Sequence, residues 1–167
     1  MFDEVRIPVS YEILRSEYLK AKKLDYKIQI LEAMLLFEQS EAKEFILDLD
    51  FDNRNVIELY IKALCLFYTK DENEILLEKI DSLDIYSCHD ILRFLINNEN
   101  LKNDLEFFKK IVYKIYHKNK CSLCRSHIFD KMIETRILDK AICEEAMHDC
   151  NENIAKAAKT FFQNEFA

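Results

Sequence analysis

Two cysteines in the carboxyl-terminal third of the chain have the spacing of metal ligands. Cys121 and Cys124 form a C-x2-C pair, His127 follows three residues later, and His148 and Cys150 lie further along the chain. Thiolate and imidazole groups at such spacings can bind one Zn²⁺ tetrahedrally. One C-x2-C pair without a second regular pair is a weak signal, and the alternative is that one cysteine faces the core at the start of a helix. The candidate ligands of a structural zinc are therefore Cys121, Cys124, His148 and Cys150, and we otherwise expect no cofactor.

The C-S-L-C segment also has the spacing of a redox-active dithiol. Such motifs are typical of βαβ proteins, and the sequence predicts no strand to supply that context. A redox role is therefore not expected from the sequence.

The chain contains no pattern typical of a catalytic site. A serine or cysteine nucleophile needs a neighbouring base and an orienting acid, and the histidines are few and scattered. They are His89, His117, His127 and His148. Because the sequence has no glycine, it contains neither a dinucleotide fingerprint nor a phosphate-binding P-loop. We expect a protein that is not an enzyme.

One stretch of the chain is strongly basic. It contains Lys109, Lys110, Lys114, His117, Lys118 and Lys120. From Lys110 to Lys118 the spacing allows one face of a helix to carry most of these side chains. We name Lys109, Lys110, Lys114, His117 and Lys118 the basic ridge and treat it as a candidate binding surface for an acidic protein partner. The alternative is that it is the solvated side of an ordinary helix.

The overall charge opposes a general role in nucleic-acid binding. The chain has a formal net charge of −7, whereas phosphate contacts require clustered lysine and arginine. Its amino terminus, MFDEVRIPVS, has no basic segment followed by an apolar one, so we expect no signal peptide and no membrane partner. Six cysteines without an export signal are expected to be reduced thiols, which favours the cytoplasm or the nucleus.

Helices must position the candidate zinc ligands and the basic ridge. The most apolar helix is expected in the middle of the chain. In the segment Val56 to Tyr68, VIELYIKALCLFY, only Glu58 and Lys62 are charged. Apolar residues cover nearly the whole circumference of this helix, so other helices must surround it. It is too short to span a bilayer, which needs about 20 apolar residues.

Helical periodicity and capping residues predict about ten helices, no strand and one domain over residues 1–167. Residues 1–9 form a short lead-in, and residues 48–53 are a polar turn before the central helix. Asp71, Ser87, Asp139 and Asn151 or Asn153 are expected to cap helices. The expected helices cover 10–23, 26–39, 40–47, 56–68, 71–81, 88–97, a long segment that starts within 100–103, 122–137, 139–149 and a last segment after Asn153.

A comparison of the chain with itself indicates a helical repeat. A shift of about 30 residues aligns ILEAMLLFEQSEAKEFILD with YIKALCLFYTKDENEILLE. Ala33 then meets Ala63, and apolar positions stay apolar. Helix pairs that recur at this spacing are typical of an α-solenoid, in which each pair buries its apolar face on the next one. The alternation of helix lengths predicts a short right-handed solenoid of the armadillo or HEAT type.

Residues 24 to 138 resemble the cytosolic armadillo-type nucleotide-exchange factors of seventy-kilodalton heat-shock chaperones. The segments that carry the resemblance are LDYKIQILEAMLLFEQSEAKEFI, YIKALCLFYTKDENEILLEKI with CHDILRFL, and KKIVYKIYHKNKCSLCRSHIFDKMIETRIL. The resemblance implies a concave surface that clasps the chaperone's nucleotide-binding domain and loosens bound ADP. It assigns no binding residue.

The sequence therefore predicts a non-enzymatic protein–protein interaction module, a small helical-repeat adaptor or chaperone co-factor. Two alternatives remain open. One is a compact helical-bundle regulator similar to viral death regulators, and the other is a zinc-stabilised binding module.

Overall fold

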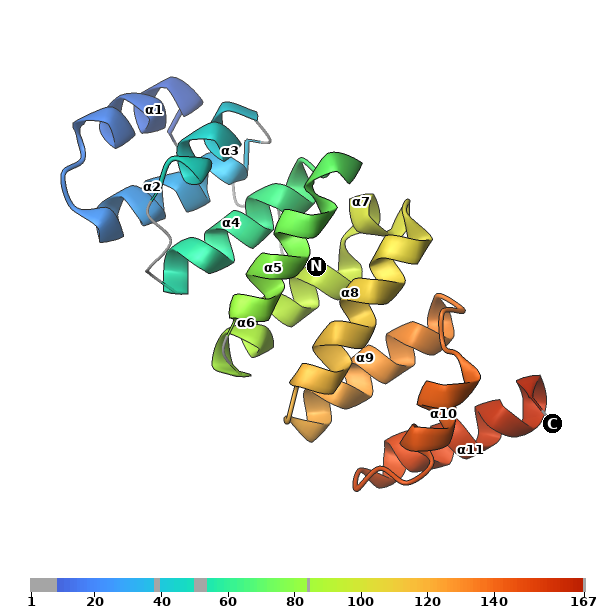
Figure 1. Cartoon of the computed structure of the whole chain (residues 1–167). Coiled ribbons are helices and arrows are strands. Elements are labelled where there is room, and N and C mark those ends of the chain that lie inside the picture. Colours follow the sequence, from blue (N-terminus) through green and yellow to red (C-terminus); the bar gives the residue numbers. More distant parts are fainter. Residues whose placement is uncertain (1–8, 38–39, 50–53, 84, 167) are drawn as a thin grey trace. The chain divides into compact units, whose positions relative to one another are not determined.

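The described part of the chain is helical and contains no strand (Figure 1). The computed structural model describes residues 9–37, 40–49, 54–83 and 85–166. Its helices are α1 (Tyr11–Lys20), α2 (Leu24–Leu35), α3 (Ser40–Leu47), α4 (Arg54–Leu66), the 3-10 helix η1 (Lys70–Glu72), α5 (Asn73–Ser82), α6 (Ile85–Asn97), α7 (Glu99–Lys102), α8 (Leu105–Lys118), α9 (Ser122–Glu134), α10 (Lys140–Ala146) and α11 (Glu152–Glu165). The all-α prediction is confirmed. The expected lead-in and polar turn fall largely outside the described residues.

The helices group into two compact units, Met1–Asp81 and Ser82–Ala167. The single domain expected over residues 1–167 stays a prediction.

In the first unit α4 is covered as the sequence predicts. α1 packs on α2, α3 packs on α4, and α2 contacts both α3 and α4. None of residues 56 to 68 is fully exposed, and Ile61 and Ala63 are completely buried. Lys62 pairs with Glu32 of α2, with 3.7 Å between Nζ and Oε1. The prediction of a helix wrapped by its neighbours is confirmed.

The second unit contains two pairs of packed helices, and α6 lies against the first of them. α8 packs on α9, and α10 packs on α11. α6 contacts both α8 and α9, and α11 contacts α9. Phe108 of α8 and Phe129 of α9 are completely buried. These helices form one apolar core. Burial of the inner face of α8 in this core fixes which face of the helix points outward.

Several boundaries differ from the sequence prediction. Asp71 lies inside the 3-10 helix η1, and α5 begins at Asn73, so the prediction of Asp71 as a cap is wrong. The long helix expected from residues 100–103 is divided into α7 and α8, because Asn98 and Asp104 each cap a helix of their own. Ser87 lies inside α6, which begins at Ile85, so its prediction as a cap is wrong. A serine in the first turn of a helix costs little, so the sequence does not locate such a boundary well. The caps predicted at Asp139 and Asn151 are confirmed.

Helix α9 ends without the glycine that often follows a helix. Arg136 has a φ of 57°, in the left-handed region. The N–H of Ile137 donates to the carbonyl of Met132 at 3.0 Å, and the N–H of Arg136 donates to Ile133 at 3.1 Å. This is a Schellman ending with arginine in the position that glycine usually occupies.

Candidate functional site

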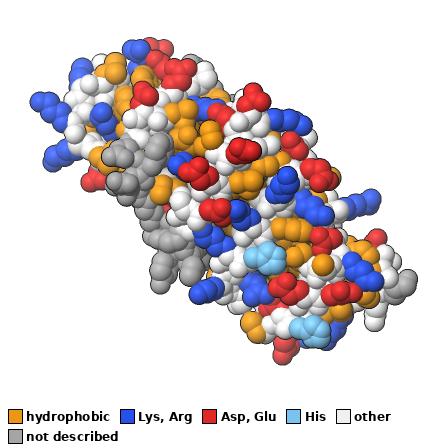
Figure 2. All heavy atoms as spheres, in the orientation of Figure 1, with side chains coloured by type: hydrophobic (Ala, Val, Ile, Leu, Met, Phe, Trp, Pro, Cys, Tyr) orange, Lys and Arg blue, Asp and Glu red, His pale blue; other side chains and the backbone are white. Residues whose placement is uncertain are grey.

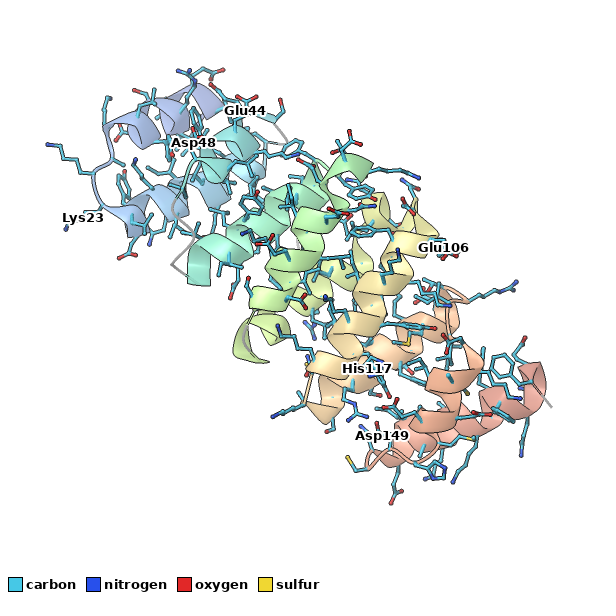
Figure 3. The ribbon with its side chains drawn as sticks, viewed as in Figure 1. Lys23, Glu44, Asp48, Glu106, His117 and Asp149 are labelled. Carbon is cyan, nitrogen blue, oxygen red and sulfur yellow. The ribbon has the colours of Figure 1, made fainter. Side chains whose placement is uncertain are left out.

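The basic ridge lies on the outer side of α8. The opposite side of this helix is buried and consists of Phe107, Phe108, Ile111, Val112, Ile115 and Tyr116. Lys110 and His117 are exposed, and Lys114 lies between them on the same helical face. Glu106 and His117 lie at opposite ends of the helix (Figure 3). The apolar side therefore fixes the direction in which the basic side chains point.

The members of the ridge differ in their contacts. Lys109 turns toward α10: its Nζ lies 3.6 Å from Oδ2 of Asp139 and 5.2 Å from the ring centroid of Tyr113. His117 lies edge-on to Tyr116, with ring centroids 5.7 Å apart. His117 and Lys118 are in the last turn, where positive charge is favourable beside the negative end of the helix dipole. Lys109 thus has a structural role, and Lys110 and His117 are the most accessible members.

Charges of both signs are interspersed with apolar side chains on the visible face of each unit (Figure 2). The basic ridge differs from such a mixed surface because all of its members are basic. A partner that binds it must present acidic groups at the spacing of one helical face.

Asp139 joins α10 to α8. Its Oδ1 accepts a hydrogen bond from the N–H of Ile142 at 3.0 Å, and its own N–H donates to the Tyr113 hydroxyl at 2.9 Å. The Tyr113 hydroxyl donates to the carbonyl of Ile137 at 2.5 Å. Burial alone would raise the pKa of Asp139, but the Ile142 N–H, Tyr113 and Lys109 hold that pKa below its usual value.

Replacing Asp139 with alanine is expected to lower the free energy of unfolding by about 1 kcal/mol at pH 7, because the first turn of α10 loses its cap. D139N keeps a capping oxygen and is expected to lose less. The pKa of Asp139 is lower in the folded chain than its usual value of 3.8. Its contribution to the free energy of unfolding is therefore fully present above pH 3.8 and is lost as the pH falls through the folded-state pKa. Urea unfolding of D139A, D139N and the unaltered chain between pH 7 and pH 3 measures this, and an equal cost for both variants would contradict it.

The four zinc-ligand candidates are not gathered around one point. Among the described residues, no group of three or more His, Cys, Asp and Glu side chains could hold a metal ion. Cys121 precedes α9, and Cys124 lies one turn later with 5% exposure. His148 and Cys150 are exposed in the segment between α10 and α11. The structure brings together Cys121 and Cys124 only.

Sequence reasoning did not find the ion pair between Arg125 and Asp149. The Asp149 side chain is 1% exposed, and the Arg125 guanidinium pairs with its Oδ2. The guanidinium carbon lies 5.1 Å from the ring centroid of Tyr116. Asp149 lies in the segment between α10 and α11 (Figure 3), and its Oδ1 accepts from the N–H of Asn151 at 2.8 Å. The pair joins α9 to the start of α11, and the two residues are too far apart in sequence to show a periodic signal.

A groove of about 660 Å³ lies between α6 and α9. Leu92, Ile96 and Leu123 supply apolar surface. The polar lining is Arg93, Asn97, Cys124, His127, Asp130, Lys131 and Glu134. The groove thus combines both signs of charge with one thiol.

No helix in the described ranges is long and apolar enough to cross a membrane. Comparisons with protein-family models, with characterised proteins and with solved structures find no match.

Proposed function

We propose that the chain is a non-enzymatic protein–protein interaction module whose helix pairs stack as a short right-handed α-solenoid of the armadillo or HEAT type. The contacts within each unit support this arrangement. The second helix of one pair lies on the second helix of the next: α2 on α4 in the first unit, and α9 on α11 in the second. Stacking of equivalent helices is how solenoid repeats bury their apolar faces.

The observation that carries the proposal is the matching burial of equivalent positions about 30 residues apart. Leu31 of α2 and Ile61 of α4 are both completely buried. The same agreement holds for Met34 with Leu64 and for Ile46 with Leu76, at 0% and 1% exposure in each pair. Residues that are equivalent in a repeat are expected to have the same environment, and these three pairs agree with that expectation.

The outer face of α8 is the proposed contact surface. Its buried side anchors the helix, so Lys110, Lys114 and His117 are presented without a large loss of backbone freedom on binding. In a chain of net charge −7, this local reversal of sign favours an acidic protein surface as the partner.

The resemblance to armadillo-type exchange factors makes a seventy-kilodalton heat-shock chaperone the first partner to test, in the cytoplasm. Exchange activity in that case belongs to the chaperone's nucleotide site, and the chain contributes binding alone.

Reversing two charges on α8 is expected to abolish capture of the partner. Immobilised K110E/K114E should retain at least tenfold less of the specific partner than the unaltered chain, since each tenfold corresponds to about 1.4 kcal/mol. The measurement is pull-down from a cell extract with mass spectrometry, followed by binding of each purified candidate, the heat-shock chaperone included, at several salt concentrations.

K156E/K159E provides the matched control, because both of these lysines are exposed on α11 and the charge change is the same. Equal capture by K110E/K114E and by the unaltered chain would contradict a role for the basic ridge. Loss of capture by both double variants would attribute the effect to net charge and would also contradict that role.

A further inference from the structure

The start of α9 brings two thiols together at a helix terminus. Cys121 occupies the N-cap position, with its thiol beside the N–H groups of Leu123 and Cys124 in the first turn. Cys124 follows one helical turn later. A turn advances about 5.4 Å, which is within the range of about 4.4–6.8 Å between Cα atoms that a disulfide can bridge. The two sulfurs are therefore placed so that a bond could form between them.

The surroundings distinguish the two thiols. The N–H of Cys124, its thiol and the N–H of Leu123 lower the pKa of Cys121. Burial, and then the hydrogen bond with Cys121, raises the pKa of Cys124 to about 11. Cys121 is partly exposed and Cys124 is buried. Because of this difference in exposure, a dissolved disulfide reaches Cys121 first, and Cys124 is the protected thiol.

A buried amide beside the pair lacks a partner for its donor group. Asn119 is 2% exposed, and its Oδ1 accepts from the N–H of Cys121 at 2.9 Å. Its Nδ2 has no hydrogen-bond partner among the described residues. The same amide lies beside the Cys124 thiol, where it counteracts the rise in pKa that burial causes. A buried donor without an acceptor is costly, and a thiolate at Cys124 would satisfy it.

A positive group approaches the pair from α6. The Arg93 guanidinium also favours the thiolate of Cys124, and both residues line the groove between α6 and α9. Cys124 and its neighbour Leu123 line this groove, which carries both signs of charge. The positive and negative side chains of that lining match a small peptide disulfide, which carries both ammonium and carboxylate groups.

We propose that Cys121 and Cys124 form a thiol–disulfide exchange site whose substrate is a small peptide disulfide such as oxidised glutathione. The Cys121 thiolate attacks one sulfur of the disulfide, the sulfur–sulfur bond breaks, and the first thiol leaves with a proton. Cys124 then loses its proton and attacks the sulfur of Cys121, which releases the second thiol. The protein dithiol is oxidised to a disulfide, and the small disulfide is reduced to two thiols. This chemistry does not depend on the proposed protein partner.

The test uses the full-length reduced chain in buffers of reduced and oxidised glutathione. After acid quenching, alkylation and peptide mass spectrometry, we expect a disulfide between Cys121 and Cys124 that varies reversibly with the redox buffer. C124S should accumulate glutathione on Cys121, and C121S should form neither product. At pH 7 Cys121 should react with iodoacetamide at least about fivefold faster than the exposed Cys150.

C150S serves as the control and should leave the disulfide unchanged. R93Q should slow the conversion of the mixed disulfide to the internal one, whereas K159Q, which removes an exposed charge on α11, should not. Because the peptide map uses the unaltered chain, a variant that fails to fold does not obscure the result. Glutathione on Cys150 with none on Cys121 would overturn the proposal. Protection of both cysteines by added Zn²⁺ without any disulfide in the redox buffers would overturn it as well.

Discussion

Replacing Arg125 with methionine is expected to lower the free energy of unfolding by about 3–5 kcal/mol. Methionine keeps the apolar stem but removes the charge, and the Asp149 side chain, at 1% exposure, is then left as a buried carboxylate without its cation. Its remaining hydrogen bond, to the N–H of Asn151 at 2.8 Å, does not neutralise it. The contact that joins α9 to the start of α11 is weakened at the same time. Chemical unfolding followed by far-ultraviolet circular dichroism measures the loss.

Two further variants show whether the buried charge is the cause. R125M/D149N removes the unpaired carboxylate, so it should be more stable than R125M alone. R15M breaks the ion pair between Arg15 and Glu41, whose side chains are 46% and 34% exposed, and should cost less than about 1 kcal/mol. A cost for R125M as small as that for R15M would contradict the assignment of Arg125 and Asp149 as a buried pair.

Replacing Phe108 with alanine is expected to cost about 3–5 kcal/mol. Phe108 is completely buried on the inner side of α8, and its removal leaves a cavity in the core of the second unit. The loss should appear in the same unfolding measurement, and a marginally stable chain would lose much of its structure at 37 °C, since total stabilities are about 5–15 kcal/mol.

Leu105 on the same helix provides the comparison. Its side chain is 48% exposed, so L105A should change the free energy of unfolding by less than about 1 kcal/mol. If F108A and L105A had similar costs, the orientation of α8 would be wrong, and the exposed position of the basic ridge would be wrong with it.

Helical periodicity predicts which side chains share a face of α8, but it does not predict which residues of other helices they contact. The spacing of Lys110, Lys114 and His117 predicts one helical face, and the structure places them on one face because the apolar residues between them are buried. The contact of Lys109 with Asp139 was not predictable in this way. It depends on how the start of α10 packs against α8, and the residues between them show no pattern that sets this packing.

For the cysteines, too, the sequence predicts a contact between near neighbours but not contacts between distant residues. The spacing of Cys121 and Cys124 predicts that they can approach each other, and they do. The grouping with His148 and Cys150 was inferred from residue type alone, and the structure does not gather the four. The contributions of Asn119 and Arg93 were not anticipated, because an unpartnered amide is recognised only when its burial is known.

The sequence by itself determined that the described part of the chain is helical, that the segment 56–68 is largely covered by neighbouring helices, and that Asp139 begins a helix. These features depend on residues three or four positions apart, whose interactions are formed within a single turn. Only the tertiary structure decided the partners of Arg125, Lys109 and Cys124, the left-handed backbone at Arg136 and the groove between α6 and α9. Most of these depend on segments that are distant in sequence, and their energies arise from burial, which no local pattern of residues specifies.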